Sequence, residues 1–268
     1  MSDPVPADLA EALAASAPHR GSFGDPLYFF SETDSTNDVA QSLAEHGAPE
    51  GATVVASGQT AGRGRLGRTW FSPQGAGLYV SLVCRNQSAA PLITLAGGVA
   101  VADGIRSATG LPVQIKWPND VVVTGGGAAG RRKLAGILAE ASTSADGLQY
   151  VILGFGINMR PAAYPPELAG RATSIETELG RVPERGMVLA ETLARFSAMF
   201  ERLAAGDAHA VLARWRQLSP SSKGARVEWD TPAGTRAGVS EGLADDGALL
   251  VRAGGRVERI ISGELRWT

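Results

Sequence analysis

The run of residues 62–70, with the sequence GRGRLGRTW, sets three arginines between three glycines within its first seven positions. Glycine lets main-chain N–H groups approach a ligand closely, and each guanidinium offers a planar fork of donors that matches a carboxylate or a phosphate. The run therefore predicts a loop that binds an anion.

The same letters fit the pattern G-x-G-x-x-G of dinucleotide-binding turns and kinase phosphate loops, but their surroundings argue against both. A dinucleotide fingerprint opens a helix and precedes an acidic ribose ligand by about 20 residues. Here the strand-like residues 77–83 follow, and Cys84 and Arg85 stand near the expected acid. The V-A-I-K, H-R-D and D-F-G patterns of a kinase do not occur in the sequence.

Five separated segments follow one another along the chain, and each is a weak signal by itself. They are Ser35–Asn37, Gln59 with the glycine–arginine run, Lys116–Asp120 (KWPND), Lys133–Leu138 (KLAGIL) and Gly154–Met159 (GFGINM). In this order they make residues 28–268 resemble the biotin-protein ligases, in the form without an N-terminal DNA-binding domain.

The resemblance implies an enzyme that uses ATP and Mg²⁺ to convert biotin to biotinyl-5′-AMP. The biotinyl group then passes to a lysine of a biotin carboxyl carrier domain, for example that of an acyl-CoA carboxylase. The first step brings a carboxylate against a polyanion, and each like-charge pair 4 Å apart costs about 4 kcal/mol at an effective dielectric constant of 20. Cations must therefore surround the reacting atoms, and the resemblance assigns catalytic roles to Lys133, Arg63 and Arg65.

The resemblance also implies two sets of binding residues and one metal ligand. Biotin is expected to contact Ser35, Thr36, Asn37, Gln59, Arg63, Gly64, Arg65, Lys133 and Gly136. The nucleotide is expected to contact Arg65, Arg68, Trp70, Asn119, Gly156 and Asn158. Asp120 is expected either to place Mg²⁺ or to orient Lys133.

Several of these residues also have a purely structural interpretation. The spacing of Ser35 and Asp38 is typical of a helix start, in which the serine caps the first turn. Trp70 is suited to pack in the core as well as to cover an adenine ring. Lys133 by itself is one more loop cation beside Arg131 and Arg132.

The composition argues against several other classes of protein. Lysine and arginine total 25 against 27 acids, a net charge of -2 over 268 residues, so the chain lacks the basic balance of a general nucleic-acid binder. Cys84 is the single cysteine, which excludes an intrachain disulfide, and the three histidines lie too far apart for metal-ligand spacing. The N-terminus has no signal-peptide pattern, so we expect a cytoplasmic protein without membrane contact.

Hydrophobic patterning predicts an α+β fold. Strands are expected at 28–30, 52–56, 78–83, 113–117, 121–123, 134–138 and 150–153, and helices at 7–15, 35–47, 92–109, 185–203 and 208–218. We expect a flexible leader over 1–26, a mixed-sheet catalytic domain similar to class II synthetases over 27–221, and a C-terminal SH3-like β-barrel over 222–268. Residues 125–130 are typical of a flexible hairpin tip. The leader is too short for a DNA-binding module, so we expect no DNA binding, and a monomer or weak homodimer.

Two alternative functions remain open from the sequence. A lipoate-protein ligase would share the fold and the adenylation chemistry, but is not expected to carry the glycine–arginine run. An RNA-binding module would use the run itself, although the sequence lacks the aromatic pattern of an RNP motif.

Overall fold

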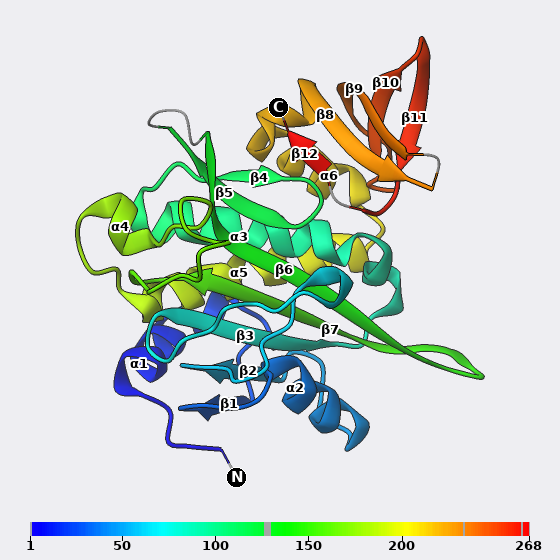
Figure 1. Ribbon diagram of the computed structural model, residues 1–268. Helices are drawn as coiled ribbons and strands as arrows, with labels where there is room; N and C mark the ends of the chain where they lie inside the picture. Colours follow the sequence, from blue (N-terminus) through cyan, green and yellow to red (C-terminus); the bar gives the residue numbers. More distant parts are fainter. Residues whose placement is uncertain (1, 126–129, 233, 264, 268) are drawn as a thin grey trace.

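The computed structural model describes residues 2–125, 130–232, 234–263 and 265–267. Its larger sheet has seven strands in the order β1-β2-β3-β7-β6-β5-β4 (Figure 1). β1 and β2 are parallel, whereas the other neighbouring strands are antiparallel, which confirms the predicted mixed sheet. The strands are β1 (Leu27–Phe30), β2 (Thr53–Ala56), β3 (Gly77–Cys84), β4 (Gln114–Lys116), β5 (Asp120–Thr124), β6 (Arg131–Ser144) and β7 (Gly147–Asn158).

Helix α3 (Ile93–Thr109) packs against one face of this sheet and is covered in turn by α5 (Arg185–Ala204) and α6 (Ala208–Leu218). As predicted, α3 ends at Gly110, whose φ of 77° lies in the left-handed region that glycine tolerates. The segment Gln87–Thr109 is long and apolar enough to cross a membrane, but 72% of its most apolar stretch is buried inside the protein. Packing in the core therefore accounts for its apolar character.

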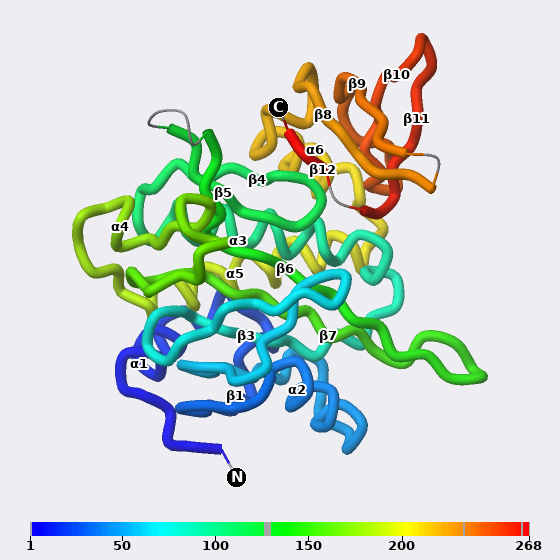
Figure 2. Tube along the Cα trace, in the orientation of Figure 1, coloured from blue at the N-terminus to red at the C-terminus, as the bar shows by residue number. Residues whose placement is uncertain are grey.

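Helix α2 (Thr36–Glu45) packs against the opposite face, over β2, β3 and β7. Its alanines form a small buried cluster with strand residues, among them Ala40, Val54, Val83 and Ile152. The chain between β2 and β3, which contains the glycine–arginine run, crosses the same face of the sheet (Figure 2). This face carries the candidate site.

The N-terminal residues belong to the core. Helix α1 (Ala7–Ser16) packs against α5, and Leu9, Leu13 and Phe23 are buried in the main hydrophobic cluster. The ring of Phe23 meets that of Phe196 edge to face, with ring centroids 4.9 Å apart. The prediction of a flexible leader over residues 1–26 is therefore wrong for this segment, because its apolar side chains cover one side of α5.

The C-terminal residues form a second, five-stranded antiparallel sheet in the order β11-β10-β9-β8-β12. Its strands are β8 (Lys223–Thr231), β9 (Gly234–Leu243), β10 (Leu249–Ala253), β11 (Arg256–Ile260) and β12 (Leu265–Trp267). Among the described residues β11 and β12 end the sheet at opposite edges, so the observed arrangement is a sheet, and a closed barrel stays a prediction. The Trp117 indole N–H donates to the Gly247 carbonyl at 3.0 Å and joins the two sheets.

The structure extends the sequence predictions in two places. β6 and β7 run well beyond the predicted residues 134–138 and 150–153 and form a long hairpin. The short helix α4 (Ile175–Leu179) was not predicted, and neither were the 3-10 turns Ala17–His19, Arg65–Gly67, Gln87–Leu92 and Pro220–Ser222. The predicted hairpin tip at 125–130 falls mostly on residues 126–129, which lie outside the described part of the chain.

Candidate active site

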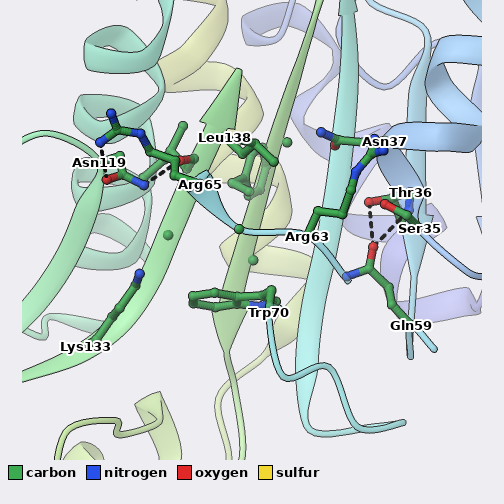
Figure 3. Close-up of a pocket in the computed structure, with 16 residues that line it drawn as sticks. Ser35, Thr36, Asn37, Gln59, Arg63, Arg65, Trp70, Asn119, Lys133 and Leu138 are labelled. Carbon is green, nitrogen blue, oxygen red and sulfur yellow. Dashed lines mark hydrogen bonds between the residues drawn. The ribbon is translucent and has the colours of Figure 1, made fainter. Parts of the chain in front are cut away.

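Two connected cavities lie on the face of the sheet that carries α2. The first is a narrow pocket of about 50 Å³ beside the start of α2 (Figure 3). The second is a broad cleft of about 800 Å³ that reaches the C-terminal sheet. Their common wall consists of Gly64, Arg65, Trp70, Asn119 and Lys133. A ligand with two chemically different ends can therefore occupy both cavities at once.

The start of α2 forms one wall of the pocket. Gln59 Oε1 accepts hydrogen bonds from Thr36 N at 2.8 Å and Thr36 Oγ1 at 3.1 Å, and Gln59 Nε2 donates to Ser72 Oγ at 3.0 Å. Ser35 occupies the position before the first helical residue, as predicted, but its side chain makes no capping hydrogen bond. Gln59 thus satisfies the first amide of α2 in place of a serine cap, and the Ser35 hydroxyl is not used for capping.

A buried polar network continues from Thr36 to Asn37. Ser81 Oγ on β3 lies 2.8 Å from Thr36 Oγ1 and 2.5 Å from Asn37 Oδ1. Asn37 Nδ2 donates to Glu140 on β6. The polar wall of the pocket is therefore fixed by hydrogen bonds between two strands and the helix start.

Arg63 is held by two carboxylates. Its Nη1 lies 2.7 Å from Asp38 Oδ1 on α2, and its Nη2 lies 2.9 Å from Glu140 Oε2. We call these three residues the Arg63 clamp. The two acids compensate this guanidinium and fasten the loop to α2 and β6, whereas the catalytic role predicted for Arg63 stays a prediction.

Three strand glycines form the floor of the site. Gly136 on β6 is paired in register with Gly156 on β7, and Gly154 lies two residues before it. A Cβ at Gly154 would overlap the carboxamide of Asn37, and one at Gly156 would overlap the Trp70 indole. The glycines of the GFGINM segment thus make room for two pocket side chains, whereas Phe155 between them is buried in the core.

Lys133 reaches the site because of an irregularity in β6. The register pairs Val121 with Ala135 but Val122 with Lys133, so Leu134 is an extra residue on β6. A bulge of this kind reverses the alternation of side chains along a strand. Lys133 and Gly136, three residues apart, consequently lie on the same face, and a Cβ at Gly136 would lie 3.3 Å from Lys133 Nζ.

The Lys133 ammonium stands at the junction of the two cavities. Its Nζ lies 2.6 Å from Asp120 Oδ1 and 5.0 Å from the centre of the Trp70 ring. Of the two predicted roles of Asp120, orientation of Lys133 is the one that this contact provides. Figure 3 shows Lys133 and Arg65 approaching the junction from separate elements.

Arg65 is held by a neutral group instead of an acid. Its Nη1 donates to Asn119 Oδ1 at 3.2 Å. Asn119 is itself fixed by Ile137, since Asn119 Nδ2 donates to the Ile137 carbonyl at 2.8 Å and Ile137 N donates to the Asn119 carbonyl at 2.9 Å. Burial lowers the pKa of Arg65, an effect that the nearby Asp120 carboxylate opposes. Arg65 therefore presents a positioned cation to the cleft.

The cleft is strongly cationic. Among its described lining residues are six cations and a single acid, Asp120; the cations are Arg65, Arg68, Lys116, Arg131, Lys133 and Arg171. The C-terminal sheet also contributes to the lining, because Trp267 on β12 faces the cleft and the Arg131 guanidinium lies 5.5 Å from its ring centre. Such an excess of positive charge is suited to a polyphosphate.

Two residues predicted to contact the nucleotide, Trp70 and Asn158, line the cleft. The Trp70 indole lies over the glycine floor instead of in the core, and its Nε1 is buried without a hydrogen-bond partner among the described residues. Asn158 Nδ2 donates to the Thr173 carbonyl at 2.9 Å, which fixes the chain after β7.

Every predicted site residue lines one of the two cavities. Sequence reasoning missed the residues that hold them, namely Asp38, Ser72, Ser81 and Glu140, and the cleft residues Arg131, Arg171 and Trp267. Two signals for them were present: Ser81 interrupts an apolar strand, and Glu140 lies an even number of residues from Gly136 on β6. Nothing in the local sequence marks Arg171.

Comparison with known proteins agrees with this fold. Residues 29–158 match the model of the biotin/lipoate A/B protein ligase family. The chain is 34% identical over 247 residues to the bifunctional ligase/repressor BirA of Bacillus subtilis, covering 90% of this chain and 74% of the relative. It is 36% identical over 238 residues to the biotin--[acetyl-CoA-carboxylase] ligase of Paracoccus denitrificans, covering 82% and 91%.

A solved structure, the biotin protein ligase of Aquifex aeolicus in complex with biotin and ATP, superposes with a TM-score of 0.76 at 29% identity. The match covers 90% of this chain and 98% of the Aquifex chain. The chain therefore belongs to the biotin/lipoate A/B protein ligase family, and among its members it is similar to the biotin protein ligases.

Proposed function

We propose that this protein is a biotin protein ligase, which makes biotinyl-5′-AMP from biotin and ATP and transfers the biotinyl group to a lysine of a biotin carboxyl carrier domain. The observation that carries the proposal is the position of Lys133, which lines both cavities. On one side lies the pocket, in which Arg63 is paired with two acids, and on the other lies the cationic cleft. The similarity to ligases named for biotin and acetyl-CoA carboxylase, and to a ligase solved with biotin and ATP, supports it.

The pocket suits the ureido ring of biotin. That ring presents two N–H donors and one carbonyl acceptor, and the start of α2 offers hydroxyls and amides of both kinds at Ser35, Thr36, Asn37 and Gln59. The glycine floor lets Asn37 and Trp70 lie close to the strands, so that both side chains line the pocket. Biotin bound in this way directs its carboxylate toward the junction at Lys133.

In the first step a biotin carboxylate oxygen attacks the α-phosphorus of ATP, and diphosphate leaves. Lys133 and Arg65 offset the negative charge that gathers as these groups meet, while Arg68, Arg131 and Arg171 line the space for the diphosphate. Fixed cations in a site that excludes water stabilise such a transition state without reorganisation. The mechanism needs no protein nucleophile.

Mg²⁺ fits this site as an ion that binds together with the nucleotide. Among the described residues no group of three or more His, Cys, Asp or Glu side chains could hold a metal alone. Mg²⁺ commonly binds through one or two carboxylates together with substrate phosphates. Asp120 is the carboxylate available for this, and the ion would supply further positive charge at the phosphates.

In the second step the amine of the acceptor lysine attacks the acyl carbon of biotinyl-5′-AMP, an amide bond forms, and AMP leaves with the electron pair of the broken acyl–phosphate bond. The Arg63 clamp fastens the loop to the sheet beside the pocket, and Arg65 on the same loop retains the intermediate. A closed loop also keeps water from the reactive anhydride.

A direct test is mass spectrometry of a biotin carboxyl carrier domain incubated with this protein, biotin and MgATP. We expect the gain of one biotinyl group on one lysine. Lipoate in place of biotin should give no transfer; preferred transfer of lipoate would favour the lipoate-ligase alternative. Absence of ATP turnover together with salt-sensitive RNA binding would favour the RNA-binding alternative.

The remaining expectations are part of the same proposal. We propose that the C-terminal sheet is an SH3-like barrel appended to a class II synthetase-like domain, and that the protein acts in the cytoplasm as a monomer or weak homodimer. We also propose that it does not bind DNA or membranes. A gel shift with operator DNA, biotin and ATP, and sedimentation with and without the two ligands, test these statements.

A further inference from the structure

Glu140 is outside the pocket lining, but it contacts two residues that form the pocket. It lies on β6 four residues after Gly136, on the same face as the glycine floor. Its Oε2 accepts from Arg63 Nη2 at 2.9 Å and from Asn37 Nδ2. One carboxylate oxygen therefore joins the glycine–arginine loop to the first turn of α2.

An ionised carboxylate only accepts hydrogen bonds, and this fixes the orientation of Asn37. The two ends of a carboxamide have nearly the same shape, so their chemical surroundings decide which end points where. Because Glu140 accepts, the amide nitrogen of Asn37 faces β6 and its oxygen faces Ser81 and Gly154. The pocket consequently presents a carbonyl oxygen above the glycine floor.

This orientation has a consequence for ligand choice. Asn37 is 5% exposed, so its carboxamide has little water to compensate an unfavourable orientation. An oxygen at this position accepts from a ligand N–H, whereas a nitrogen would repel it. A ligand with a cyclic urea, such as biotin, presents N–H groups.

We infer that Glu140 is a positioning residue that sets the pocket's preference for an N–H donor by orienting Asn37, and that it anchors the loop through Arg63. The inference rests on the proposed binding of biotin in this pocket. Both Glu140 and Asp38 form an ion pair with Arg63, and exposed ion pairs by themselves contribute little to stability. Glu140 differs from Asp38 because it also accepts a hydrogen bond from the buried Asn37.

The test is the dissociation constant of biotin measured by calorimetry without ATP, so that binding is separated from chemistry. Glu140→Leu keeps approximately the size of the side chain but removes the acceptor for Asn37. We expect biotin binding to weaken about tenfold, as for the loss of one buried hydrogen bond. The ATP dissociation constant should change no more than it does in Asp38→Asn, since loosening of Arg63 is the effect that both variants share.

Two further variants separate the contacts. Asp38→Asn loosens Arg63 but leaves Asn37 in place, so biotin binding should weaken less than about threefold. Glu241→Gln removes an Arg–Glu pair of the C-terminal sheet, between Arg252 Nε and Glu241 Oε1 at 2.5 Å, and should change nothing in the pocket. Glu140→Ala provides a second substitution at the position if Glu140→Leu folds poorly.

A double-mutant cycle with Asn37→Ala gives the decisive result. If Glu140 acts through Asn37, then Glu140→Leu should add less than about twofold to the effect of Asn37→Ala. Two results would overturn the inference alone: multiplicative effects of the two substitutions, or a Glu140→Leu variant that binds biotin as tightly as the parent. A parent protein that does not bind biotin would overturn the proposed function as well.

Discussion

Arg63 and Arg65 are two residues apart in the same loop, yet they face opposite electrostatic surroundings. Arg63 lies between Asp38 and Glu140, at 2.7 and 2.9 Å, whereas Arg65 rests on the neutral amide of Asn119 at 3.2 Å. The first cation is compensated by the protein, and the second is left for a ligand. The same residue type in one motif thus serves to fasten the loop in one place and to bind an anion in the other.

The same contrast extends over the whole site. Near α2 the polar groups satisfy one another in a network of Ser81, Thr36, Asn37 and Gln59. In the cleft the described lining cations outnumber the acids by six to one. The polar network near α2 is suited to a neutral urea, and the cationic cleft is suited to a polyanion. Five substitutions, at Lys133, Arg65, Arg63, Gly154 and Gly156, test the contrast between the compensated pocket and the cationic cleft.

Lys133→Ala should have the largest effect, because it removes the cation at the junction. We expect biotin-dependent exchange of diphosphate into ATP to fall about 10²–10³-fold, as for the loss of one preorganised electrostatic group. The biotin dissociation constant without ATP should change less than about threefold. Lys223→Ala, at an exposed position on β8, is the matched control. Exchange within tenfold of the parent would refute the assignment.

Arg65→Ala and Arg63→Ala compare the two loop cations directly. A hydrogen bond to a charged group contributes about 1.5–3 kcal/mol to binding. Its loss in Arg65→Ala should therefore speed release of biotinyl-5′-AMP by about 10–100-fold. Arg63→Ala should have a smaller effect, since its charge is already compensated. The measurement is release of labelled intermediate after rapid gel filtration. A larger effect from Arg63→Ala would reverse the comparison.

Gly154→Ala and Gly156→Ala separate the two ends of the glycine floor. The new Cβ at 154 displaces Asn37, so biotin binding should weaken about tenfold, while the Cβ at 156 displaces Trp70 and should weaken ATP binding by a similar factor. Calorimetry with each ligand alone distinguishes them. If both variants weaken binding of the same ligand, the pocket and the cleft are not separate environments.

Glu50→Gln should have the smallest effect and concerns an uncompensated acid far from the site. Burial raises the pKa of Glu50, and the backbone amides of Arg85 and Asn86, which donate to Oε2, partly oppose this rise. The other oxygen, Oε1, is buried without a hydrogen-bond partner among the described residues. Because the folded pKa is the higher one, the folded state binds more protons, and the free energy of unfolding falls as pH rises from the unfolded toward the folded pKa.

The expected gain from Glu50→Gln is modest, since the side chain is partly exposed and solvent screens its charge. We expect Tm to rise by about 1 °C at pH 7 and to be unchanged near pH 3, where the parent carboxyl is protonated in both states. Thermal melts by circular dichroism at the two pH values measure this. An equal gain at both pH values would show that the effect is not electrostatic.

Local pattern determined most of the elements. The apolar spacing of residues 92–109 and the following Gly110 are sufficient to place α3, since a helix end needs only a residue that tolerates positive φ. The strands were found but their lengths were not, because the outer part of β6 is polar and the missed end of β7, residues 154–158, contains two glycines, which are rare in strands. The apolar residues of the N-terminal segment were underestimated, since their burial depends on α5, which lies far along the chain.

The sequence by itself determined the mixed α+β fold and a set of residues that line the two cavities, because these depend on periodicity and on the order of a few short segments. Only the tertiary structure decided what each of them contacts. The bulge at Leu134 places Lys133 beside Gly136, and two acids on α2 and β6 hold Arg63. Both outcomes depend on the register and approach of elements distant in the chain, which no local pattern encodes.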